Sequence, residues 1–127
     1  MPASLVLVAD DDADILTLVR LRLERSGYDV VAARNGRDAL DLVHSRRPDV
    51  AIFDVAMPEL TGLEVTRRLR DEHSDLPVIL LTAAAMDADV AAGAGSGANE
   101  YMTKPFSPQE LESRVRALGQ LPRVPVG

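Results

Sequence analysis

Five short apolar segments recur along the chain, and a stretch with helical signals follows each one. The apolar segments span residues 5–9, 28–33, 50–53, 78–81 and 100–103. This alternation predicts βα repeats and therefore an α/β fold with a parallel sheet. Because crossovers between parallel strands are nearly always right-handed, the compact arrangement is a doubly wound five-stranded sheet with five helices. We expect the strand order 2-1-3-4-5, a common order for such sheets, which would place the first and third strands side by side.

The helical stretches differ in strength. The first ends near Ser26, the second ends before Pro48, and the third begins near Thr61. The last begins after Ser107, which is a good N-cap followed by proline, and ends near Gly119. Residues 86–99 are a weaker helix candidate, because each interior glycine there costs roughly 1 kcal/mol relative to alanine. The apolar stripe of the first helix consists of Ile15, Leu18, Val19, Leu21 and Leu23.

Polar side chains stand where four of the apolar segments end. Asp10 and Asp11 follow the first segment, Asp54 follows the third, Thr82 the fourth and Lys104 the fifth. The carboxyl ends of parallel strands open on one edge of the sheet, where ligands bind. We therefore expect these five side chains to converge, although they lie far apart in sequence.

Composition narrows the classes of protein to which the chain can belong. Its 127 residues suit one domain, it has no cysteine, and its net charge is −6. This balance argues against a nucleic-acid interface, and the apolar runs are too short to span a membrane. We expect a cytoplasmic domain. Lys104 is the only lysine, since the other 13 basic residues are arginine, which indicates a need for a compact ammonium group at that edge.

The converging residues suit phosphoryl transfer. Three carboxylates in contact need a counter-charge, and Mg²⁺ prefers such oxygen ligands. Asp54 could attack phosphorus and form an aspartyl phosphate, while Lys104 and the metal flank the transferred group. The Thr82 hydroxyl would donate to a phosphoryl oxygen. Taken singly, each of these residues is better explained as a helix cap, a turn or a surface charge, so the inference depends on their convergence.

Four segments together resemble the receiver domain of two-component response regulators, the CheY-like family with a flavodoxin-like fold. They are residues 5–12 with the acidic pair, 53–62 with its Met-Pro and Gly loop, 81–83 with Thr82, and 97–106 with Lys104-Pro105. The resemblance covers residues 4–119 and implies a receiver domain there. Residues 120–127 then form a C-terminal tail or linker.

The resemblance implies a role for each residue at the site. Asp54 accepts a phosphoryl group from a sensor histidine kinase or a phosphotransfer protein. Asp10, Asp11, Asp54 and the backbone carbonyl of Ala56 hold Mg²⁺, and Lys104 pairs with the phosphoryl group. Such a domain is not an enzyme in the ordinary sense, since it promotes only its own phosphorylation and dephosphorylation.

The resemblance also implies a switch and an output. Thr82 moves toward the phosphoryl group and Tyr101 packs inward, which changes the surface of the fourth helix, fifth strand and fifth helix. A cis peptide bond is expected before Pro105. The output is either an effector domain after residue 127 or a separate target protein.

Two departures from the family pattern limit the inference. Ala56 and Ala84 have no polar group at positions that often influence the attacking water, so the phosphoryl lifetime stays open. Residues 86–95 contain no basic side chain, so a full set of ion pairs across a dimer through this region is not expected. We expect a monomer or a weak, activation-dependent dimer.

Other functions remain open from the sequence. The chain could be a receiver-shaped protein–protein module that is never phosphorylated. A haloacid-dehalogenase-like phosphatase also uses a strand-end aspartate, but Asp14 replaces its usual Thr or Val. A flavodoxin-like electron carrier needs a hydroxyl-rich loop and more aromatic residues. A calcium loop at residues 10–15 would need glycine where Ile15 stands.

Overall fold

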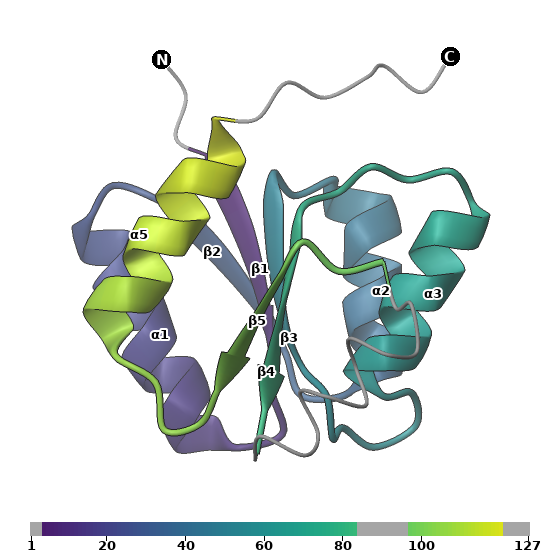
Figure 1. Ribbon diagram of the computed structural model, residues 1–127, viewed down its shortest axis with the longest axis horizontal. Helices are drawn as coiled ribbons and strands as arrows, with labels where there is room; N and C mark the ends of the chain where they lie inside the picture. The colour runs from purple at the N-terminus through teal and green to yellow at the C-terminus, as the bar shows by residue number, and fades with distance from the viewer. Residues whose placement is uncertain (1–3, 84–96, 121–127) are drawn as a thin grey trace.

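The computed structural model describes residues 4–83 and 97–120, and these residues form a three-layered α/β fold (Figure 1). Five parallel strands lie in the order β2-β1-β3-β4-β5, which confirms the predicted topology. The strands are β1 (Leu5–Ala9), β2 (Asp29–Ala33), β3 (Val50–Asp54), β4 (Val78–Thr82) and β5 (Glu100–Thr103). The helices are α1 (Ala13–Arg25), α2 (Gly36–Arg46), α3 (Gly62–Asp71) and α5 (Pro108–Gly119). The helix expected at 86–99 falls largely outside the described residues.

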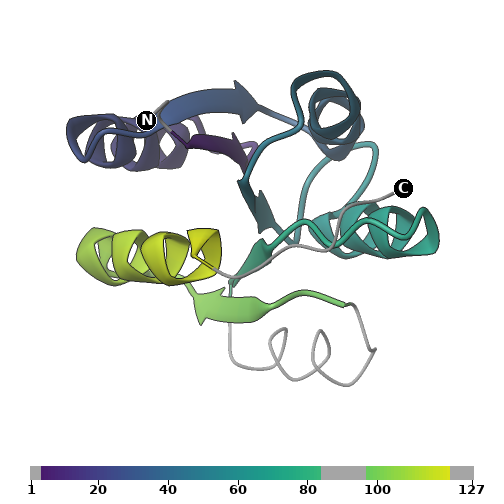
Figure 2. The same cartoon turned by 90° about the horizontal axis from the view of Figure 1, so that it is seen from above.

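The helices cover both faces of the sheet. Figure 2 shows α1 and α5 on one face and α2 and α3 on the other. Alternate residues of the central strands point into the two layers, so Val6 and Ile52 pack with α1 and α5 whereas Leu7 and Phe53 pack with α2 and α3. Strands buried on both faces read as continuous apolar runs, which is why the strand positions were visible in the sequence.

The buried stripe of α1 differs from the stripe predicted from the sequence. Leu16, Val19 and Leu23 are buried, whereas Leu18 and Leu21 are 49% and 51% exposed. Residues 16, 19 and 23 follow the spacing that keeps one face of a helix against a sheet. Leu18 and Leu21 lie away from that face, so the prediction was wrong for these two residues. Their exposure could not be read from hydropathy.

Two glycines allow the loop between β3 and α3 to fold against its neighbours. A Cβ atom on Gly62 would lie 2.4 Å from the Asp54 carbonyl oxygen, and one on Gly36 would lie 1.9 Å from the Leu60 carbonyl oxygen. Gly62 also donates its N–H to the Val55 carbonyl at 3.0 Å. The loop therefore runs directly over the end of β3, and α3 begins at the point where its first turn touches Asp54.

Replacing Gly62 with alanine tests this close approach. We expect Gly62→Ala to lower the free energy of unfolding by about 2 kcal/mol, because the added methyl group forces backbone to move. Gly119→Ala is the matched control, since its Cβ would meet nothing closer than 3.9 Å. Urea unfolding should show no loss of stability for the control, and equal stability of the two variants would contradict the explanation.

Candidate functional site

Three carboxylates meet at the carboxyl edge of the sheet. One side-chain oxygen from each of Asp10, Asp11 and Asp54 lies within 4.8 Å of the others. The register explains the meeting, because Ala9 pairs with Phe53 and the next residues along both strands are Asp10 and Asp54. Asp10 is fully buried and Asp54 is 6% exposed, whereas Asp11 faces solvent. The predicted convergence of the acidic residues is therefore present.

Lys104 lies between the two buried carboxylates. Its Nζ donates to Asp10 Oδ2 at 2.9 Å and lies 3.4 Å from Asp54 Oδ1. The backbone places this side chain, because Lys104 N donates to the Thr82 carbonyl at 2.7 Å directly after β5. The peptide bond between Lys104 and Pro105 is cis. The single lysine of the chain thus reaches two carboxylates at once from a neighbouring part of the sheet edge.

Backbone groups fix the orientation of Asp10. The Asp12 N–H donates to Asp10 Oδ1 at 2.9 Å, while Lys104 holds the other oxygen. Asp12 itself caps α1, because its Oδ1 accepts from the N–H groups of Asp14 and Ile15. The first and third aspartates of the run therefore have different tasks: Asp10 pairs with Lys104, whereas Asp12 caps the helix. From the sequence alone, Asp10 could equally have been a helix cap.

The three carboxylates carry more negative charge than the single ammonium of Lys104 can offset. Burial first and the nearby charge of Asp10 second raise the pKa of Asp54 to about 6, because together they outweigh the opposing effect of Lys104. Burial alone would lower the pKa of Lys104, but its hydrogen bond and ion pair with Asp10, together with Asp54, raise that pKa above its ordinary value. Lys104 therefore stays charged at neutral pH, and its ammonium pairs with two of the three carboxylates.

The donor set fits a hard divalent cation. Three carboxylates from two adjacent strand ends, with one side open to solvent at Asp11, are the kind of oxygen ligands that Mg²⁺ takes alongside water. The raised pKa of Asp54 shows that a further positive charge would be favourable there. Asp10, Asp11 and Asp54 are the residues that could hold the ion.

Thr82 and Tyr101 lie on the two strands beyond Asp54. Thr82 is fully buried at the end of β4 and pairs in register with Thr103, while Tyr101 pairs with Leu80 and is partly buried against the α2 and α3 layer. Asp54 pairs with Leu81, the residue before Thr82. The threonine therefore ends on the same edge as the acidic cluster. Ala84 lies outside the described residues.

Arg34 is a second cation at this edge that the sequence analysis missed. It directly follows β2, and its Nη2 donates to the Asp11 carbonyl at 3.3 Å. The sequence held one indication of this placement. Arg34 directly follows the second predicted strand, which ends on the same edge of the sheet as the first. An exposed arginine after a short strand has no distinguishing motif, so only the structure connects it with the acidic loop.

The raised pKa of Asp54 predicts how the stability of the metal-free protein depends on pH. An aspartate with a pKa of about 6 in the folded state and 3.8 as its ordinary value binds a proton more tightly when folded. Stability from this group is therefore present below pH 4 and lost as the pH rises through 6. Asp54→Asn removes the ionisable group. At pH 7 in EDTA, the free energy of unfolding of the variant should therefore be about 2 kcal/mol higher than that of wild type.

The advantage of Asp54→Asn should shrink as the pH falls toward 4, which denaturant titrations at several pH values would measure. Asp41→Asn, at an exposed position of α2, is the control and should change stability by less than about 0.5 kcal/mol. If Asp54→Asn were less stable than wild type at pH 7, the charged Asp54 side chain would not be destabilising, which would contradict this explanation.

Comparison with known sequences and structures assigns a family to this arrangement. Residues 6–116 match the response regulator receiver domain family. The chain is 44% identical over 113 residues to the alkaline phosphatase synthesis transcriptional regulatory protein PhoP of Bacillus subtilis, covering 89% of this chain and 47% of that protein. It is 47% identical over 113 residues to the response regulator MprA of Mycolicibacterium vanbaalenii, covering 89% of this chain and 49% of that protein. The chain spans about half the length of these curated relatives.

The fold leads to the same family. The receiver domain of the Francisella response regulator 1452 superimposes with a TM-score of 0.86 at 38% sequence identity, covering 92% of this chain and 97% of that one. No helix among residues 4–83 and 97–120 is long and apolar enough to cross a membrane. The acidic cluster, the lysine that pairs with it and the 2-1-3-4-5 sheet thus belong to one signalling fold. This chain is a member of the receiver domain family of two-component response regulators.

Proposed function

We propose that Asp54 is the phosphoacceptor of this receiver domain and that Mg²⁺ is required for the transfer. The observation that supports the proposal most directly is the position of Lys104 Nζ, 2.9 Å from Asp10 and 3.4 Å from Asp54. A cation held between a buried carboxylate and a candidate nucleophile suits a site where phosphoryl charge develops. Asp10, Asp11, Asp54 and the carbonyl of Ala56 would hold the ion.

The transfer itself needs few steps from the protein. One carboxylate oxygen of Asp54 forms a bond to phosphorus as the bond from phosphorus to the donor's imidazole nitrogen breaks, and the electron pair of that bond stays on the imidazole. The product is an acyl phosphate on Asp54. An Mg²⁺ ion held by the acidic cluster would supply positive charge to offset the charge of the phosphoryl oxygens.

The residues around Asp54 would stabilise the phosphorylated form. The Lys104 ammonium would pair with a phosphoryl oxygen in place of its ion pair with Asp54. The Thr82 hydroxyl, at the end of the neighbouring strand, would donate to another phosphoryl oxygen, and Tyr101 would pack inward as Thr82 moves. The consequence is a changed surface around β5 and α5, which would carry the signal.

The donor and the output follow from the family, and they are part of the proposal. The phosphoryl donor would be a sensor histidine kinase or a phosphotransfer protein. We propose a receiver unit at residues 4–119, followed by a tail or linker at 120–127 that leads to an effector domain or ends a chain acting on a separate target. The cytoplasmic location and the monomer or weak dimer stay predictions from the sequence.

Phosphorylation of Asp54 can be tested with a small donor. Incubation with acetyl phosphate and Mg²⁺ should add the mass of one phosphoryl group to the intact protein, whereas EDTA should prevent the gain. Asp54→Ala should show no gain, and Asp12→Ala, which removes a helix cap, should retain it. Absence of the gain in wild type that demonstrably binds Mg²⁺ would favour an unphosphorylated interaction module instead.

The geometry of Lys104 can be tested by keeping its charge and changing its shape. Lys104→Arg should slow phosphorylation by acetyl phosphate about 100-fold, since a planar guanidinium cannot occupy the position of the Nζ atom between two carboxylates. Arg37→Lys, an exposed substitution in α2, is the control and should leave the rate unchanged. A rate near that of wild type for Lys104→Arg would show that charge alone is sufficient.

A further inference from the structure

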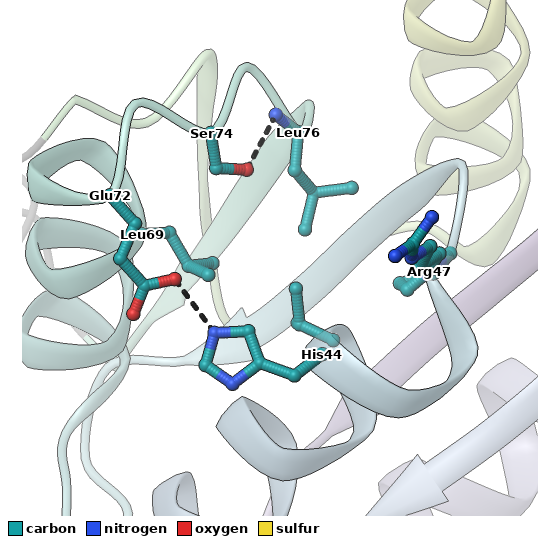
Figure 3. A pocket seen from close by; sticks show the side chains of 8 residues that line it. His44, Arg47, Leu69, Glu72, Ser74 and Leu76 are labelled. Carbon is teal, nitrogen blue, oxygen red and sulfur yellow. Dashed lines mark hydrogen bonds and ion pairs between the residues drawn. The ribbon is translucent and has the colours of Figure 1, made fainter. Parts of the chain in front are cut away.

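A pocket lies between the ends of α2 and α3, at the opposite edge of the sheet from the acidic cluster. Its volume is about 490 Å³, within the range of roughly 300–1,000 Å³ typical of small-molecule sites. Pro48 and Leu76 line it just before β3 and β4 begin, which places it at the amino edge of the strands. The remaining lining residues are Val43, His44, Arg47, Leu69, Glu72 and Ser74 (Figure 3).

The floor of the pocket is apolar and belongs to the core. Leu69 and Leu76 are each 1% exposed and Val43 is 8% exposed, and all three belong to the hydrophobic cluster under α2 and α3. Figure 3 shows Leu69 and Leu76 directed toward the space between the two helices. A ligand that fills this space therefore needs a compact apolar body.

Two polar side chains at the rim, Arg47 and Ser74, have donor groups that no acceptor among the described residues uses. His44 Nε2 donates to Glu72 Oε1 at 2.7 Å, so one oxygen of the only carboxylate among the lining residues is already engaged. Within the described part of the chain, no group accepts from the Arg47 guanidinium. The Ser74 hydroxyl accepts from the Leu76 N–H at 3.2 Å and can still donate its own hydrogen. The rim therefore offers hydrogen-bond donors to an incoming acceptor.

The backbone of Arg47 holds its side chain at this rim at some cost. Arg47 closes α2 with φ 49° and ψ 63°, a left-handed conformation in which glycine or asparagine is usual. Its N–H donates to the Val43 carbonyl at 3.1 Å. The helix cap could be made by glycine without strain, so the cap itself does not explain the presence of a long cationic side chain.

Two arginines oppose the negative groups around the pocket, which are the carboxyl ends of two helices and Glu72. The carboxyl ends of α2 and α3 oppose an anion, but Arg70 offsets them by donating to the Ser74 carbonyl at 3.0 Å and to the Leu76 carbonyl at 2.8 Å. Arg47 adds a second cation with a fork that matches a carboxylate. A bare inorganic anion would leave the apolar floor uncovered.

We propose that the pocket between α2 and α3 is a binding site for a compact apolar monocarboxylate, with Arg47 holding the carboxylate and the floor of Val43, Leu69 and Leu76 holding the apolar body. The site is separate from the phosphorylation site, and the proposal does not depend on Asp54. The carboxyl ends of the two helices limit the affinity, so we expect weak binding with a Kd on the order of 1 mM for a one-ring probe.

Backbone amide shifts of the unphosphorylated chain would test the site. Benzoate, benzyl alcohol and benzylammonium are titrated at constant ionic strength, because they share a ring and differ in charge. Benzoate should give saturable shifts confined to residues 43–48 and 69–76. Benzyl alcohol and benzylammonium should bind at least about 10-fold more weakly, since neither accepts a bidentate pair from arginine.

Three variants distinguish specific binding of benzoate in the pocket from nonspecific attraction of an anion to arginine side chains. Arg47→Gln should weaken benzoate about 10-fold and leave benzyl alcohol unchanged, while Arg46→Gln, one residue away and not lining the pocket, should change neither. Glu72→Gln should strengthen benzoate and weaken benzylammonium, because it removes the opposing carboxylate. The amide spectra also report whether each variant is folded.

Several outcomes would overturn the proposal. They are shifts from benzoate that do not saturate or that spread over other arginine-rich surfaces, tighter binding of benzylammonium than of benzoate, and unchanged benzoate affinity in a folded Arg47→Gln variant. Any of these would leave the pocket without a role in binding a carboxylate.

Discussion

The functional site depends on one ammonium group at an edge of the sheet where three carboxylates meet. Asp10 and Asp54 are buried because the strands that carry them are central, and burial removes the water that would otherwise stabilise their charge. Lys104 supplies the only positive charge within reach of both that the described contacts show. The result is a site that folds but remains short of positive charge. A divalent metal ion would offset this imbalance, because the three carboxylates are oxygen ligands of the kind such an ion takes.

The sheet makes this concentration of charge possible. Neighbouring parallel strands end at the same level, so residues from β1, β3, β4 and the segment after β5 meet without any long loop being ordered. The loop after Asp54 is held down by close contacts at Gly36 and Gly62 that have no room for a side chain. The rigidity of this edge keeps the carboxylates together despite their repulsion, because the core beneath is closely packed.

The two edges of the sheet differ in chemistry. The carboxyl edge carries buried acids and an ammonium, whereas the amino edge carries a pocket with an apolar floor and arginine donors between the ends of α2 and α3. The same hydrophobic layer, which includes Phe53 and Leu69, lies under both. A ligand at the amino edge would therefore rest on side chains that also pack behind the strand bearing Asp54.

The sequence by itself determined the strands, their order, the acidic residues and the lysine, because buried parallel strands are continuous apolar runs and their polar ends stand out. It also identified the family, to which the sequence and structure comparisons assign the chain. It could not separate Leu16 from Leu18 or Leu21 as the buried residues of α1, since hydropathy does not say which side of a helix faces the sheet. Only the tertiary structure decided that Lys104 pairs first with Asp10, that Arg34 reaches the acidic loop, and that Arg47 lines a pocket. These are contacts between side chains and backbone far apart in sequence, and their distances depend on how the layers pack.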